Sequence, residues 1–202
     1  MPVFRNIPPK RRLMKKIVSS YKLHRKALAE DFNFRCGYCD CAEEFRRTDY
    51  HIDHFIPKSF LEKIFLDKEK YKIEEQKYSN LVYSCHFCNK AKWNKWPTKR
   101  IDHSYKNDEG FIDPCEAEYE YQFTRNENSE IIPKTKLGEW MYLELKLGNP
   151  EHSIIWHIEE IYNEIKEIKK TCGYMKSNKS AKLTKLTLEL SDYFEKLIEN
   201  KS

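Results

Sequence analysis

The sequence of 202 residues contains no apolar run that approaches the roughly 20 residues of a membrane-spanning helix. Its first stretch, MPVFRNIPPKRRLMKK, is charged and has no apolar h-region, so we expect no secretory signal and a cytoplasmic location. Glycine is scarce, at five residues, and no glycine-rich phosphate-binding loop occurs. Any dependence on ATP would therefore have to come from a partner.

Acidic residues are missing from two stretches of the chain. Residues 1–29 contain nine Lys or Arg and no Asp or Glu, and residues 90–100 (KAKWNKWPTKR) contain five basic residues and two tryptophans. Clustered basic residues are typical of contact with a polyanion, although a solvated basic face is an equally good interpretation of either stretch alone. The charge pattern favours nucleic acid as the partner class.

The seven cysteines are an odd number in a chain that we expect in the cytoplasm, which argues against a disulfide framework. Four of them form two CxxC pairs, Cys36 with Cys39 and Cys85 with Cys88. Thiolates two residues apart can both reach one tetrahedral zinc ion. The alternative is that all four pack as small reduced side chains. The spacing predicts a structural Zn²⁺ site, for which Cys41 is a competing ligand.

Hydrophobic periodicity predicts an α+β chain with a mainly helical C-terminal region. The expected elements are a helix over 13–30, a strand over 48–56 ended by Pro57, helix over 60–78, a helix near Asn89, irregular β-structure over 111–132, a helix over 136–147, and an antiparallel helical hairpin built on the repeats Ile154–Ile168 and Leu183–Leu197. We divide the chain into a basic segment and helix (1–34), a core (35–108), and a β-hairpin with helices (109–202).

The order CGYC…DHFIPKS…NL…CHFCNKAK, from Cys36 to Lys92, resembles the zinc-containing HNH endonucleases. The segment GFIDP…EYQFTR…EIIPKT…LELKLGN is similar to the C-terminal part of small HNH proteins of anti-phage systems, the PtuB-type nucleases of Septu and their retron-linked relatives. The resemblance implies a ββα-metal (HNH) core with a CxxC/CxxC zinc site. It also implies metal-dependent endonuclease activity, with DNA as the expected substrate and anti-phage defence or restriction as the setting.

The resemblance also implies a role for each residue of the motif. His54 would be the general base, Asp53 and Asn89 would hold one Mg²⁺ or Mn²⁺ ion, and Asn80 would fix the loop and orient His54. Contacts to nucleic acid are expected from basic residues near the motif, namely Lys58, Lys90, Lys92 and Lys95.

The chemistry of these residue types agrees with those roles. Imidazole titrates near neutral pH and can accept a proton from water. A carboxylate with an amide oxygen is a hard ligand set that suits Mg²⁺ or Mn²⁺, whereas thiolates suit zinc. Neighbours on a regular strand face opposite sides, so Asp53 and His54 need a bend or strand end at 54–56 to serve one phosphate. His51 is interpreted as an ordinary polar neighbour.

Two other functions remain open at the level of sequence. One is a zinc-dependent nucleic-acid-binding module without catalysis, and the other is an effector subunit that is inactive without a partner ATPase. RNA is an open alternative to DNA as substrate. One motif supplies one active site, so a monomer is expected to nick a duplex.

Overall fold

The computed structural model describes residues 3–14, 18–46, 48–170 and 177–199. Helices and two-stranded sheets follow one another along the chain, so the predicted α+β class is confirmed. The α-helices are α1 (Arg25–Asp31), α2 (Lys58–Ile64), α3 (Lys68–Gln76), α4 (His86–Lys92), α5 (Lys136–Glu144), α6 (Pro150–Lys170) and α7 (Ser177–Glu199). The strands are β1 (Tyr50–His54), β2 (Leu81–Cys85), β3 (Tyr105–Lys106), β4 (Glu109–Gly110), β5 (Phe123–Arg125) and β6 (Ile131–Pro133).

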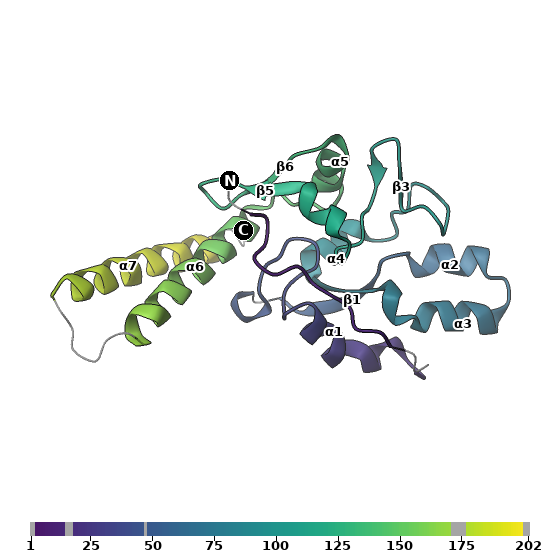
Figure 1. The fold of residues 1–202 in the computed structure, drawn as a ribbon, viewed down its shortest axis with the longest axis horizontal. Coiled ribbons are helices and arrows are strands. Elements are labelled where there is room, and N and C mark those ends of the chain that lie inside the picture. The colour runs from purple at the N-terminus through teal and green to yellow at the C-terminus, as the bar shows by residue number, and fades with distance from the viewer. Residues whose placement is uncertain (1–2, 15–17, 47, 171–176, 200–202) are drawn as a thin grey trace.

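The centre of the molecule is the antiparallel pair β1–β2 followed directly by α4 (Figure 1). Asp53 pairs with Val82 and His54 with Leu81 in the register of the two strands. Helices α2 and α3 form the excursion between the strands and lie to one side of them in Figure 1. β1 ends at His54, so the predicted strand is confirmed in its central part and the chain turns where we expected.

Of the predicted helix over 13–30, the described residues 13–14 and 18–20 are not helical, so the prediction is wrong there, and residues 15–17 lie outside the described part of the chain. The described part of this segment begins its helical structure with a 3₁₀-helix, η1 (Tyr21–His24), which runs into α1. The Ser20 hydroxyl accepts a hydrogen bond from the Lys22 amide and caps η1, which defines the start. Leu13 is 95% exposed, so it does not belong to the apolar face that the periodicity suggested.

One hydrophobic core receives side chains from most of the described chain, from Phe4 to Leu197. Some of the basic residues near the N-terminus are used to fasten this core. Arg5 is buried and donates to the Gly37 carbonyl at 3.1 Å, and Arg11 pairs with Asp113 at 2.8 Å. These guanidinium groups stabilise the fold, so the basic character of residues 1–29 is only partly a free surface.

The predicted helical hairpin is confirmed as α6 and α7, which extend together from the rest of the molecule (Figure 1). Ile161 and Ile165 of α6 pack with Leu186 of α7 in a second apolar cluster. The predictions of helices over 60–78 and 136–147 are borne out by α2, α3 and α5, and the β5–β6 hairpin falls in the predicted β-region over 111–132 except for Pro133. Cys172 lies outside the described residues.

The described helices include none that combines the length and apolar character needed to cross a membrane.

Candidate functional site

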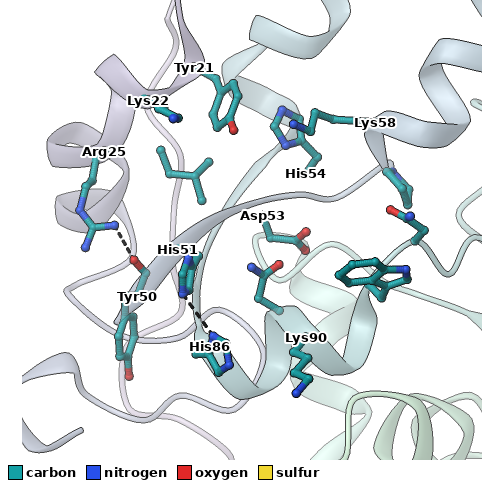
Figure 2. A pocket seen from close by; sticks show the side chains of 15 residues that line it. Tyr21, Lys22, Arg25, Tyr50, His51, Asp53, His54, Lys58, His86 and Lys90 are labelled. Atoms are coloured by element: carbon teal, nitrogen blue, oxygen red, sulfur yellow. Dashed lines mark hydrogen bonds between the residues drawn. The ribbon is translucent and has the colours of Figure 1, made fainter. Parts of the chain in front are cut away.

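A cleft of about 740 Å³ lies over β1, between η1 with α1 on one side and α4 on the other. Figure 2 shows the side chains that line it, with Asp53 and His54 projecting from the end of β1. Asp53 is the one acidic residue in the described lining, which also includes four basic side chains, namely Lys22, Arg25, Lys58 and Lys90. The cleft is therefore suited to an anionic ligand.

His54 is held in one orientation by the backbone. Its Nε2 atom lies 3.0 Å from the Glu75 carbonyl oxygen, which can only accept, so Nε2 carries the proton and Nδ1 the lone pair. The Tyr21 ring packs edge-on against the imidazole, with ring centroids 4.6 Å apart. Burial lowers the pKa of His54, while the Glu75 carbonyl acts in the opposite direction. The imidazole is therefore neutral at pH 7.

Asp53 is buried and already has two partners. Tyr38 donates its hydroxyl to Oδ2 at 2.6 Å, and the ammonium of Lys92 lies 3.1 Å from the same oxygen. Burial and the Asp53 carboxylate raise the pKa of Tyr38, so the phenol stays a donor. Both contacts use Oδ2, which leaves Oδ1 as the oxygen that a cation could bind.

Asn80, at the end of the 3₁₀-helix η3 (Tyr78–Asn80), clasps the turn that follows β1. Its Oδ1 accepts from the Ile56 amide at 2.8 Å, and its Nδ2 donates to the Ile56 carbonyl at 3.1 Å. Its own carbonyl accepts from the Phe55 amide at 2.8 Å. These three bonds fix the chain directly after His54. Asn80 does not line the cleft, which agrees with a positioning role.

Asn89 lies in α4 and lines the cleft together with Asp53. Its side-chain amide makes no hydrogen bond to any other residue that the structure describes, so its oxygen is free to accept a ligand. His51 and His86 contact each other across the strand end, with Nε2 and Nδ1 3.4 Å apart (Figure 2). The prediction that His51 is an ordinary polar neighbour stays a prediction.

The two CxxC pairs come together at the end of β2 and the start of α4. The thiols of Cys36, Cys39, Cys85 and Cys88 are buried and lie within 4.8 Å of one another, so they could hold a metal ion such as zinc. The Sγ atoms of Cys39 and Cys85 are 3.8 Å apart, and zinc with bonds of about 2.3 Å places tetrahedral sulfur ligands about 3.8 Å apart. The donor set and its spacing both fit zinc.

Cys41 belongs to a second buried group, with Cys39 and His152. The Arg46 guanidinium, which can only donate, lies 2.8 Å from Nδ1 of His152, so that lone pair is already used. Cys39 completes the set of four thiols described above. These contacts favour the two CxxC pairs over Cys41 and His152 as the metal ligands.

The structure corrects one predicted contact to nucleic acid and weakens another. Lys92 is fully buried, and its ammonium donates to the His54 carbonyl at 3.0 Å, so the prediction that it contacts phosphate is wrong. Lys95 pairs with Glu144 at 2.6 Å and does not line the cleft. Lys58 and Lys90 do line the cleft, where a phosphate could reach them.

Three contributors to the site were not identified from the sequence. Tyr38 lies inside the first CxxC pair, but nothing in its spacing indicates a bond to Asp53. Glu75 acts through its backbone carbonyl, which leaves no signal in residue type. Tyr21 belongs to the basic segment, where the charge pattern drew attention to its neighbours instead.

Comparison of the chain with models of known families, with curated proteins and with solved structures finds no match in any of the three.

Proposed function

We propose that the protein is a metal-dependent endonuclease of the HNH type that hydrolyses phosphodiester bonds in DNA. One observation carries the proposal: a neutral imidazole with a fixed tautomer, His54, shares one basic cleft with the oxygen ligands of Asp53 and Asn89. A hydrolase of this kind needs a base, ligands for a cation, and a positive surface for the phosphate. The cleft offers a residue type suited to each of these three roles, which supports the proposal.

His54 removes a proton from the attacking water through Nδ1, while its Nε2–H bond to Glu75 holds the ring and stabilises the imidazolium that forms. Lys58 and Lys90 hold the substrate phosphates in the cleft. Asn80 keeps the turn after β1 rigid, so that the position of His54 is set before substrate binds.

Asp53 and Asn89 would hold a Mg²⁺ or Mn²⁺ ion, with water molecules in the other positions. Such an ion supplies stabilisation of the charge that develops on the phosphate and on the leaving oxygen. The fit is limited by Lys92, whose ammonium already lies 3.1 Å from Asp53 and reduces the attraction of the carboxylate for a second cation. We therefore expect weak cation binding in the absence of substrate phosphate.

The thiols of the CxxC pairs would hold Zn²⁺ in a structural role, in the ββα-metal arrangement that the motif order suggests. Cys85 ends β2 and Cys88 lies in α4, so one ion would join the strand pair to the helix that bears Asn89 and Lys92. Zinc would in this way preserve the geometry of the cleft without taking part in the cleavage.

The test is cleavage of supercoiled plasmid with Mg²⁺ or Mn²⁺ by the wild type, His54→Ala and His103→Ala. His103 is exposed and pairs with Asp102, away from the cleft, which makes it the matched control. We expect nicking by the wild type and the control, and its loss in His54→Ala. Equal cutting by all three would refute the proposal. Binding of DNA without any cleavage would favour the zinc-dependent binding module.

A further inference from the structure

The two tryptophans that follow α4 have different environments. Trp96 is buried, packs on Phe55 with ring centroids 5.4 Å apart, and donates its indole N–H to the Arg100 carbonyl at 2.8 Å. Trp93 is 67% exposed and lines the cleft. Its ring contacts no aromatic ring and no cation among the residues that the structure describes. Trp96 is part of the core, whereas Trp93 is an uncovered aromatic surface in the candidate site.

The backbone at Trp93 has a conformation that is ordinarily reserved for glycine. Its φ of 47° and ψ of −132° are close to those of the first central residue of a type II′ turn. The Lys95 amide donates to the Lys92 carbonyl at 3.1 Å and closes this turn. A bulky side chain at such a position is strained, and strain of this kind is concentrated at functional sites. Packing does not explain the tryptophan here, because its side chain is exposed.

The neighbours of Trp93 in the cleft complete a surface for a nucleic-acid strand. Lys90 lies one turn earlier in α4, and Lys22 and Arg25 line the facing wall. An aromatic ring beside a basic groove is the arrangement with which proteins bind single strands, since bases stack on the ring while the backbone follows the positive charge. In an intact duplex the faces of the bases are covered by their neighbours.

We propose that Trp93 stacks on an unpaired base of the substrate, so that the cleft takes single-stranded segments of nucleic acid, including those that negative supercoiling opens in a plasmid. This inference rests on the proposed function, because it assigns the strand type that the same cleft binds. Removing the indole changes no charge. The general attraction for phosphate should therefore stay as it is, and only the affinity for exposed bases should fall.

The test uses fluorescence anisotropy with labelled oligonucleotides of about 12 nucleotides, a length within the usual site size. Single-stranded DNA, single-stranded RNA and blunt duplex DNA are compared at one salt concentration, in a His54→Ala background that prevents cleavage. The variants are Trp93→Ala, Trp93→Phe, and the control Tyr121→Ala, which removes another exposed aromatic ring outside the cleft. Zinc content and circular dichroism establish that each variant is folded.

We expect Trp93→Ala to weaken binding of a single strand by about 5- to 150-fold, the range measured for loss of one stacked base. Trp93→Phe should lose less, and Tyr121→Ala should lose nothing. Duplex affinity should be unchanged in all three, and the single strand that binds more tightly identifies DNA or RNA as the substrate. Unchanged single-strand affinity in Trp93→Ala, or an equal loss for duplex, would overturn the inference.

Plasmid cleavage separates this inference from the proposed function. Cleavage that depends on His54, together with unchanged single-strand binding by Trp93→Ala, overturns the stacking role and leaves the nuclease in place. A protein that neither cleaves plasmid nor binds any of the three oligonucleotides overturns both.

Discussion

The buried pair of Lys92 and Asp53 gives a prediction that does not depend on catalysis. The Lys92 side chain is 0% exposed and that of Asp53 is 8% exposed, with 3.1 Å between Nζ and Oδ2. Replacing Lys92 by Met keeps most of the side-chain volume but leaves a buried carboxylate without its cation. Removing one partner of a buried pair costs about 3–5 kcal/mol, a large part of the 5–15 kcal/mol that stabilises a typical domain.

The assay is urea denaturation followed by circular dichroism, at one fixed concentration of free zinc because bound metal adds to stability. Lys90→Met is the matched control: it makes the same change two residues earlier in α4, where the side chain is exposed, and should alter the free energy of unfolding by no more than about 0.5 kcal/mol.

A double-mutant cycle with Asp53→Asn isolates the pair itself. The double variant no longer has a buried charge at this pair, so its loss should be smaller than the sum of the two single losses by about 2–3 kcal/mol. A loss below about 1 kcal/mol for Lys92→Met, as for an exposed pair, would refute the burial argument. Strictly additive losses would show that the two charges do not interact.

Four further results follow from the same geometry. Cys36→Ser or a strong chelator should remove a single zinc ion and unfold the chain, which metal analysis and circular dichroism measure; a folded metal-free protein would contradict the zinc site. Gly37→Ala should cost about 1–3 kcal/mol in urea denaturation, because the new Cβ would lie 2.6 Å from Phe32 Cε1. Burial lowers the pKa of His54 from its ordinary 6.5, so the imidazole is still a neutral base at pH 7. The value of kcat/KM should therefore fall only when the pH drops through that lowered pKa. A fall in kcat/KM that begins above pH 6.5 would contradict this. Trp93→Gly should be more stable than Trp93→Ala by about 1–2 kcal/mol, since glycine alone fits the turn; the opposite order would remove the argument from strain.

Local sequence patterns were sufficient to predict the parts of the structure that depend on residues close together in the sequence. The CxxC spacing predicted four thiols that do lie together, and the regular isoleucines and leucines predicted the α6–α7 hairpin. Charge patterning gave a wrong prediction where a basic residue has a partner far away in the sequence. Lys92 looked like part of an exposed basic patch, yet it is buried because Asp53 and the His54 carbonyl receive its ammonium.

The prediction of where the first helix starts failed for a related reason. The spacing from Leu13 to Ala27 fits a helix, but periodicity measures only how residues would line up if the helix formed. The main chain at Lys10 donates to the Asp31 carbonyl, and Arg12 binds the Asp31 side chain, so this stretch is held alongside α1 instead of continuing it. Tertiary contacts of this kind are not visible in the sequence.

Asp53 and His54 are neighbours in one strand, and a residue of α4 holds them in a fixed position relative to each other. A regular strand would direct the two side chains to opposite faces, and β1 ends at His54 so that the turn clasped by Asn80 can begin. Lys92 then bonds both the His54 carbonyl and the Asp53 carboxylate, so a single ammonium from α4 fixes the two neighbours relative to each other. Because Cys88 lies in the same helix, loss of the metal that the thiols would hold should displace Lys92 and disturb both residues together.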